Sequence, residues 1–312
     1  MSKENTVLVI LILFLAILPL SESRFYIFLG TDILIMGLFA VSLNLLLGYT
    51  GLVSFGQAAY FGIGAYTCAL LMKKASVAFP LSFTAAGVFG AVAAMIIGFF
   101  CIQLTKIYFA MLTLAFSQIV WAIAFKWNSL TGGDTGLIGV NFPATLDSPT
   151  RFFYFTLAVV AGSFYLLRRL VNSPFGRILT TIRENPERTE FIGINVKRFQ
   201  LMAFMISGFF AAIAGALFGI FNHSIFPDFI FWPQSAEVLI MSLLGGIYNF
   251  FGPLVGAAVL LYLRMQVTSF TQYWPLILGT ILALLLFFFP GGIVGFLKSQ
   301  RWFSGGVDDA DR

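Results

Sequence analysis

The sequence predicts an all-α fold: a polytopic transmembrane helical bundle of about eight to ten spans, with one short helix on the cytoplasmic side. Hydrophobic residues make up 59% of the 312 residues and charged residues 10%, and the mean hydropathy is +0.95. These values exclude a soluble globular domain. The apolar runs do not alternate with polar residues, as the strands of a membrane β-barrel do. We therefore expect residues 1–312 to form a single membrane domain.

Ten apolar runs are candidate spans, because a helix needs roughly 20 apolar residues to cross a bilayer. They cover 6–20, 25–47, 51–72, 80–102, 106–125, 152–167, 200–221, 235–247, 252–264 and 272–290. No small-residue cleavage site convincingly follows the first run, so it is interpreted as an uncleaved helix rather than a signal peptide. Several runs are short or interrupted by glycine, which predicts that some helices are tilted or broken.

The distribution of charge predicts the orientation of the bundle. The polar segment 168–199 holds seven of the 18 basic residues and three acids. Basic loops stay on the cytoplasmic side, so 168–199 is predicted to be cytoplasmic. Ten crossings then place the tail 291–312 on the same side and the loop 126–151 outside. Lys73 and Lys74 fall on the outer side in this scheme, which counts against it.

Two of these polar segments have further signals. The loop 126–151 is rich in glycine, asparagine and threonine, which predicts a surface turn or a contact for a substrate-delivering partner. In 168–199, Asn185-Pro186-Glu187 is typical of a helix start, since asparagine suits the N-cap and proline the first helical position. A helix is expected from Pro186 to about Ile192, ended by Gly193 and Asn195. It is either a solvated surface helix or a plug for a cytoplasmic partner.

The glycine-rich segment 44–66 is expected to contain non-helical turns, because glycine permits conformations that other residues avoid. A faint internal repeat supports a break there. Residues 32–38 resemble 237–243, and each heptad is followed by paired glycines. Broken helices commonly line transporter pathways, although tight helix packing is an alternative interpretation. The pathway candidates are Asn44, Ser54, Gln57, Gly48, Gly51, Gly245 and Gly246.

Other patterns predict packing and pairing. Ala211, Gly215 and Gly219 recur every four residues, as do Gly252 and Gly256, which is typical of close helix packing. The ionisable residues inside the runs are Asp32, Glu237 and Arg264. The two acids are expected near span ends, and Glu237 is expected to pair with Arg264, because charges inside a bilayer are costly.

The sequence lacks the motifs of an enzyme or of a metal site. It has no GxxxxGK[ST] phosphate loop and no nucleophile with a paired base, and a single histidine, His223, excludes an HExxH motif. We expect no catalytic residue, no metal and no cofactor bound by this chain. Cys68 and Cys101 lie in apolar runs, which argues against a disulfide. The net charge of +5 fits basic loops facing anionic lipid rather than nucleic acid.

Four stretches carry a resemblance to a known family, in the family's order. They are 44–66 (NLLLGYTGLVSFGQAAYFGIGAY), 106–140, 173–204 and 237–258. Together they resemble the permease subunits of branched-chain amino-acid ABC importers, LivM type. The resemblance implies a second related permease subunit, two ABC ATPase subunits that hydrolyse the ATP, an extracytoplasmic binding protein, and a bacterial or archaeal cytoplasmic membrane. Permeases for urea, amides or sugars are the alternative, and a self-sufficient secondary carrier is a second one, disfavoured because no chain of acids and histidines crosses the membrane.

The resemblance also implies which residues receive the work of the ATPases. The matching cytoplasmic coupling segment comprises Arg183, Glu184, Asn185, Pro186, Glu187, Arg188, Glu190, Gly193 and Asn195. The sequence departs from the family pattern at Gln57, where relatives often have histidine, and at Pro186 and Arg188, where small or acidic residues are common. The first departure concerns the substrate, and the second leaves the coupling segment recognisable.

Overall fold

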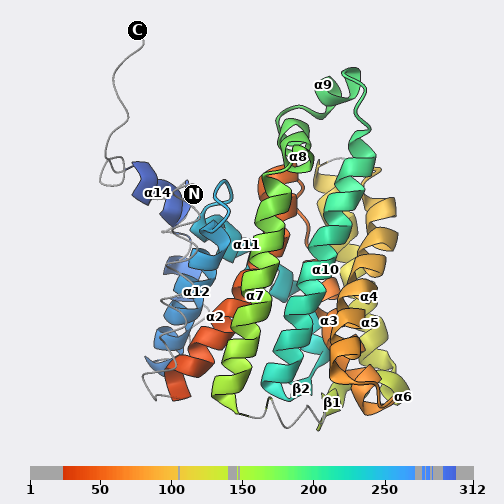
Figure 1. Cartoon of the computed structure of the whole chain (residues 1–312), viewed down its shortest axis with the longest axis vertical. Helices are drawn as coiled ribbons and strands as arrows, with labels where there is room; N and C mark the ends of the chain where they lie inside the picture. Colours follow the sequence, from red (N-terminus) through yellow and green to blue (C-terminus); the bar gives the residue numbers. More distant parts are fainter. Residues whose placement is uncertain are drawn as a thin grey trace.

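Long helices aligned along one axis make up most of the molecule (Figure 1). The computed structural model describes residues 24–104, 106–139, 146, 148–270, 276–277, 279–281, 283 and 291–299. Within these residues, five helical segments are long and apolar enough to cross a membrane. They are α2 (Arg24–Asn44) with its π-helical extension η2 (Leu45–Thr50), α4 (Phe79–Cys101), α5 (Lys106–Lys126), α7 (Pro149–Val171) and α10 (Val196–Asn222). The all-α membrane fold expected from composition is confirmed.

Three shorter helices of the described residues also belong to the bundle: α3 (Gln57–Lys73), α11 (Trp232–Gly245) and α12 (Gly252–Phe270). At about 1.5 Å per residue, α11 is shorter than the roughly 30 Å hydrocarbon core of a bilayer. Eight of the ten predicted runs correspond to helices of the described residues. At least one of these helices, α11, is too short to cross a bilayer fully, in line with the short runs noted in the sequence. The run 6–20 lies outside the described residues, as does most of 272–290. In the tail, α14 (Gly292–Ser299) is described.

Helix α2 forms the centre of the bundle, with 89% of its most apolar window buried, whereas α5 is on the outside with 22% buried. The predicted small-residue faces are confirmed as packing surfaces. A Cβ at Gly215 of α10 would overlap the carbonyl of Phe61 on α3, and a Cβ at Gly256 of α12 would overlap the carbonyl of Met241 on α11. Only glycine permits backbones to approach this closely.

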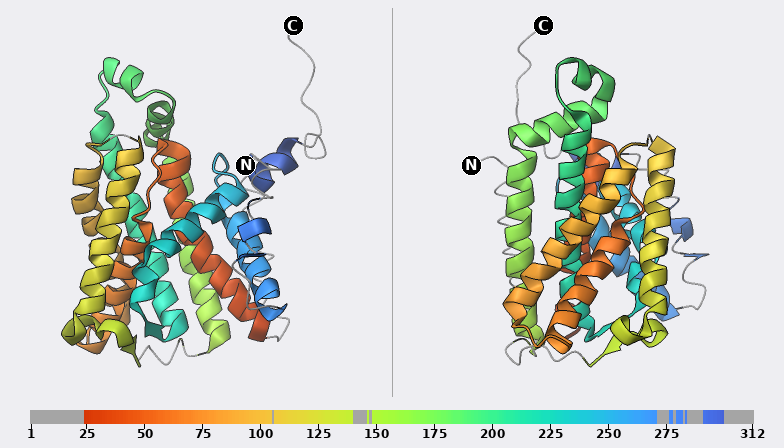
Figure 2. Two further views of the ribbon diagram at one scale, coloured as in Figure 1. Left: turned by 180° about the vertical axis from the view of Figure 1, so that it is seen from behind. Right: turned by 90° about the vertical axis from the view of Figure 1, so that its right-hand side faces the viewer.

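The two ends of the bundle are built differently, and Figures 1 and 2 agree on which elements lie at each. One end carries α8 (Pro174–Glu184) and α9 (Pro186–Phe191), and we call it the α8–α9 end. The opposite end, the β1–β2 end, carries α6 (Asn128–Thr131), η3 (Gly133–Thr135), β1 (Leu137–Ile138) and β2 (Ser224–Ile225). The strands pair antiparallel, with Leu137 opposite Ile225. The 3-10 turn η5 (Pro227–Ile230) follows β2.

Lys73 and Lys74 lie at the β1–β2 end, the side on which basic residues were not expected. Their hydrogen bonds give a structural reason for this position. Lys73 Nζ donates to the carbonyl oxygen of Ile138 at 2.8 Å, and Lys74 Nζ donates to that of Leu130 at 3.0 Å. Both ammonium groups therefore hold the segment that follows α5. The segments predicted to face opposite sides of the membrane, 126–151 and 168–199, lie at opposite ends of the bundle where they are described.

The polar segment 168–199 is more ordered than the sequence indicated. Helix α7 continues to Val171, so Arg168 belongs to its last turn, is 8% exposed and stacks over the ring of Phe251 at 5.6 Å. Helix α8 was not predicted at all. It buries Leu179 and Ile182 and leaves its charged side chains outside. A short amphipathic helix of this kind is stabilised by its contact with the bundle rather than by its own propensity.

Candidate functional site

Helix α9 begins as its sequence predicts. The Asn185 side chain accepts a hydrogen bond from the backbone N–H of Arg188 at 2.9 Å, and Pro186 occupies the first turn. Gly193 follows the helix with φ +86°, a conformation that glycine adopts without strain. The prediction that Asn195 also helps to end α9 was wrong. Its side chain instead accepts from the N–H of Arg198 at 3.1 Å and caps the start of α10.

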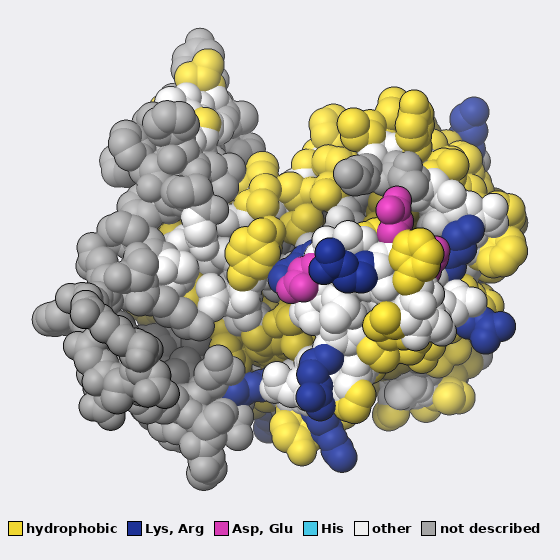
Figure 3. All heavy atoms as spheres, turned by 90° about the horizontal axis from the view of Figure 1, so that it is seen from above, with side chains coloured by type: hydrophobic (Ala, Val, Ile, Leu, Met, Phe, Trp, Pro, Cys, Tyr) yellow, Lys and Arg dark blue, Asp and Glu magenta, His cyan; other side chains and the backbone are white. Residues whose placement is uncertain are grey.

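The tip of α9 presents two apolar side chains to the outside. Phe191 is 90% exposed and Ile192 is 69% exposed. The side chains around them are charged and exposed: Glu184, Glu187, Arg188 and Glu190. Figure 3 looks onto this end and shows basic, acidic and hydrophobic side chains gathered on one face. An exposed apolar pair rimmed by charge indicates a protein contact. Sequence reasoning missed this pair, although it is the one apolar stretch in Arg183–Gly193.

Helix α8 lies flush with the bundle, and Arg183 in its last turn connects it to the core. Arg183 Nη1 donates a hydrogen bond to the carbonyl oxygen of Gly48 in η2. Its guanidinium lies over the ring of Tyr248, 5.1 Å from the centroid. A Cβ on Gly51 would lie 3.0 Å from Arg183 Cγ. Arg183, one of the predicted coupling residues, therefore contacts the first glycine break at Gly48 and Gly51 and lies against Tyr248, two residues after the second break.

The two glycine breaks lie beside each other beneath α8. A Cβ at Gly48 would overlap the carbonyl of Ile247, the residue after Gly246. Gly51 has φ +73° and Gly246 has φ +106°, so both end their helices in conformations that disfavour other residues. The break in the first helix is a π-helix, a form often found at functional sites. The predicted breaks at 48–51 and 245–246 are therefore confirmed as departures from α-helix.

The helices that carry the two heptads of the faint repeat, α2 and α11, also run side by side. Gln234 Nε2 lies 3.9 Å from Met36 Sδ, and Ser242 Oγ donates to the carbonyl oxygen of Ala40 at 3.3 Å. Contacts that advance together along both helices mean that α2 and α11 run in the same direction. Their broken ends consequently meet at the α8–α9 end.

The polar pathway candidates Asn44, Ser54 and Gln57 are buried inside the chain, each at most 1% exposed. Gln57 Nε2 donates to Ser207 Oγ at 2.6 Å and to Ser42 Oγ at 3.3 Å. Its Oε1 and both polar atoms of the Asn44 amide have no hydrogen-bond partner among the described residues. In this conformation the Gln57 side chain ties α3 to α2 and α10. Contact of Asn44, Ser54 and Gln57 with a substrate stays a prediction.

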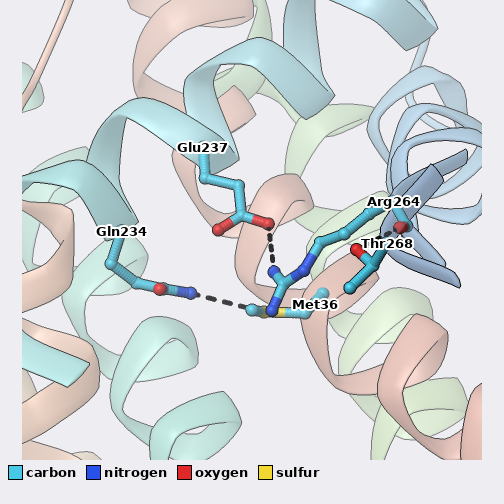
Figure 4. A network of polar contacts seen from close by, with 5 residues as sticks. All are labelled: Met36, Gln234, Glu237, Arg264 and Thr268. Carbon is cyan, nitrogen blue, oxygen red and sulfur yellow. Dashed lines mark hydrogen bonds and ion pairs between the residues drawn. The ribbon is translucent and has the colours of Figure 1, made fainter. Parts of the chain in front are cut away.

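The expected ion pair inside the membrane region is confirmed. Arg264 Nη1 donates to Glu237 Oε1 at 2.8 Å, and Figure 4 shows the two side chains meeting between α11 and α12. The third ionisable residue, Asp32, lies about two turns into α2. Its Oδ1 is buried and accepts no hydrogen bond from the described residues.

The two cysteines and the single histidine all lie in the described part of the chain. Cys68 and Cys101 are buried free thiols, so the absence of a disulfide is confirmed. His223 is the C-cap of α10, with φ 52°. In the described part of the chain, no three residues of histidine, cysteine, aspartate or glutamate are grouped to hold a metal ion.

Comparison with known proteins gives a consistent result. The family model described as "Branched-chain amino acid transport system / permease component" matches residues 25–290. The high-affinity branched-chain amino acid transport system permease protein LivM of Escherichia coli (strain K12) is 28% identical, over 98% of this chain and 78% of that protein. The probable permease proteins LivM and LivH of Methanocaldococcus jannaschii are 26% and 25% identical, over 82% and 83% of this chain and 89% and 88% of theirs. No solved structure matches the chain.

Proposed function

Because the chain belongs to the family of branched-chain amino acid transport system permease components, we propose that it is a permease subunit of an ATP-driven importer for branched-chain or other hydrophobic amino acids. Its relatives are named as branched-chain amino acid permeases. Those names favour this substrate class over urea, amides or sugars. The proposed location is a bacterial or archaeal cytoplasmic (inner) membrane, which the chain crosses several times, with the α8–α9 end facing the cytoplasm.

The proposed assembly has four kinds of subunit. A second, related permease subunit is supported by the likeness to both LivM and LivH proteins. Two ABC ATPase subunits bind the α8–α9 end and hydrolyse the ATP, and an extracytoplasmic binding protein delivers substrate to the β1–β2 end. This chain itself is not an enzyme, binds no cofactor and has no nucleic-acid partner.

The observation that carries the proposal is the connection from the exposed tip of α9 to the broken helices. The tip, Phe191 and Ile192, fits an apolar groove on an ATPase subunit. A displacement of α8 is passed by Arg183 to Gly48 and Tyr248, because these contacts join α8 to η2 and to the segment that follows α11. Movement at two adjacent breaks changes the tilt of α2 and α11. That motion would alternate access between the two faces of the membrane.

The test is leucine uptake by proteoliposomes that contain this chain and the permease, ATPase and binding-protein products of neighbouring genes. With ATP in the lumen and the binding protein outside, leucine should accumulate, and omitting ATP or the ATPases should abolish the uptake. Excess isoleucine and valine should compete, whereas urea should not.

The matched control uses this chain alone in liposomes with an imposed ion gradient. We expect no accumulation. Leucine accumulation by the isolated chain would show that it is a secondary carrier and not an ABC permease. Competition by urea in the full complex would contradict the proposed amino-acid substrate.

A further inference from the structure

Helix α3 begins without a cap of its own. Its N-cap is Gly56, which has no side chain to accept from the amides of the first turn. Acceptors come instead from helices that are distant in the sequence. The Ala58 N–H donates to Ser235 Oγ of α11 at 2.8 Å, and the Phe55 N–H, just before the helix, donates to Thr113 Oγ1 of α5 at 3.2 Å. Ser235 and Thr113 are both 0% exposed. The start of α3 therefore depends on where α11 and α5 lie.

The start of α3 also lies deep in the bundle. The helix has 17 residues and ends at Lys73, at the β1–β2 end, so its first turn is roughly 25 Å from that end. At such depth a bilayer offers no water to a backbone amide, and a buried N–H without an acceptor is unfavourable. If Ser235 Oγ is withdrawn, the Ala58 N–H is satisfied only when a water-filled space reaches it.

The hydrogen bond from Ala58 to Ser235 joins two pairs of interlocked helices. Helix α3 is interlocked with α10, where a Cβ at Gly64 would overlap the carbonyl of Ala212. Helix α11 is interlocked with α12, where a Cβ at Gly245 would overlap the carbonyl of Gly252. Backbones in such close contact resist sliding past each other. A movement of α11 therefore takes α12 with it and leaves α3 with α10.

Helix α11 reaches from this hydrogen bond to the second glycine break. Ser235 is in its first turn, and Gly246 is the C-cap at its other end. Tyr248, over which the Arg183 guanidinium lies, follows two residues later. An α-helix of 14 residues spans roughly 20 Å. A tilt of α11 imposed at the α8–α9 end consequently displaces Ser235 from Ala58.

We propose that Ser235 is a positioning residue of the transport cycle. Its hydroxyl keeps the non-helical segment 51–56 and the start of α3 closed while α11 is in its present position, and its withdrawal when α11 tilts lets water reach Ser54 and Gln57. The inference deepens the proposed function and rests on it, because the tilt of α11 is part of that function. It adds the step by which this tilt opens two of the pathway candidates.

The first experiment measures the leucine imported per ATP hydrolysed by the full complex, because this ratio does not depend on how much of the complex is folded. Ser235→Ala removes the acceptor, so the segment opens whether or not α11 tilts, and accumulated leucine leaks back. We expect the ratio to fall about tenfold or more. Ser235→Thr retains a hydroxyl and should keep a ratio close to that of the unmodified complex.

The matched control is Ser242→Ala, which removes another buried serine hydroxyl from the same helix. That hydroxyl donates to the Ala40 carbonyl of α2 and makes no bond to α3 among those of the described residues. Ser242→Ala should therefore leave the ratio unchanged.

A second experiment keeps Ser235 and remains decisive if Ser235→Ala fails to fold. The full complex carrying Ser54→Cys is treated with a membrane-permeant maleimide, and the labelled peptides are mapped by mass spectrometry. Ser54 is 0% exposed, so a thiol at this position reacts only when the segment opens. We expect labelling at residue 54 to be roughly tenfold faster during ATP hydrolysis than without nucleotide. The buried thiols of Cys68 and Cys101 provide the internal control, and their labelling should not respond to ATP.

The outcomes separate this inference from the function on which it rests. An unchanged ratio in Ser235→Ala, or labelling at residue 54 that ignores ATP while leucine uptake proceeds, would overturn the role of Ser235 and leave the function standing. Absence of ATP-driven leucine uptake by the unmodified complex would instead remove the proposed function.

Discussion

Arg183 in α8 donates a hydrogen bond to the carbonyl oxygen of Gly48, 135 residues earlier in the chain. The same guanidinium lies 5.1 Å from the centre of the Tyr248 ring, which follows the break after α11. One partly buried arginine thus connects the element proposed to contact the ATPases with the two places where helices are interrupted. Hydrogen bonds to charged groups contribute about 1.5–3 kcal/mol. We therefore expect a displacement of α8 to be transmitted through Arg183 to both interruptions.

Changing the α9 tip should weaken the ATPase contact without unfolding the chain. Phe191 is 90% exposed, and surface substitutions usually change stability by no more than about 0.5 kcal/mol. In Phe191→Asp, we expect the amount of ATPase that copurifies with the permease to fall about tenfold or more, since a buried apolar anchor contributes 2 kcal/mol or more at an interface. Phe191→Tyr should retain the ATPase. Undiminished copurification in the aspartate variant would remove α9 from the contact.

The turn after α9 should depend on backbone conformation rather than on space. Gly193 has φ +86°, and an added Cβ would meet no atom within 4 Å. Asparagine tolerates this conformation, whereas valine is strained by about 1–2 kcal/mol. Gly193→Asn should therefore support leucine uptake close to that of the unmodified chain, and Gly193→Val should not. Equal uptake by the two variants would show that the turn does not position α9.

The buried network around Gln57 should tolerate one substitution and not another. Gln57→Leu removes an amide whose Oε1 is unpaired, and Ser207 keeps its bond to the Ser42 carbonyl, so the free energy of unfolding should change by less than about 1 kcal/mol. Ser207→Ala leaves the Gln57 amide without its shortest partner and should cost about 1–3 kcal/mol. Thermal unfolding in detergent measures both.

Uptake in the same Gln57→Leu variant decides whether this side chain lines the pathway. Loss of leucine uptake at unchanged stability would support the pathway prediction made from the sequence. Full uptake would contradict it and leave Gln57 with a structural role alone.

Helix packing should be far less tolerant at Gly215 than at Gly162. A Cβ at Gly215 would overlap the Phe61 carbonyl, whereas one at Gly162 in α7 would meet nothing within 4 Å. Gly215→Ala should therefore destabilise the protein by about 1–3 kcal/mol. Gly162→Ala should be neutral or stabilise it by about 0.5–1 kcal/mol through helix propensity. Equal unfolding temperatures for the two variants would contradict the close approach of α3 and α10.

Features encoded by neighbouring residues could be predicted from the sequence, and contacts between distant ones could not. The Asn185 cap, the breaks at Gly48–Gly51 and Gly245–Gly246, and the small-residue faces follow from local backbone chemistry. The pairing of Glu237 with Arg264 was predictable because charges in a bilayer need partners.

The other features of the site depend on contacts between residues that are far apart in the sequence. The contact of Arg183 with Gly48 and Tyr248 requires knowledge of which helix ends meet, and no local pattern carries that information. Helix α8 was missed because its buried face contains few apolar residues between charged ones. The carboxyl of Asp32 in α2 also interacts electrostatically with the Glu237–Arg264 pair of α11 and α12, and that convergence appears only in the folded chain.

The number of leucine molecules imported per ATP hydrolysed by the full complex carrying Arg183→Gln tests the coupling connection most directly. The matched control is Arg177→Gln, which removes an exposed charge from the same helix. We predict that Arg183→Gln lowers this ratio about tenfold or more while ATP hydrolysis continues, because the ATPases still bind α9 but α8 no longer moves the broken helix ends. A ratio equal to that of the unmodified complex would contradict the account.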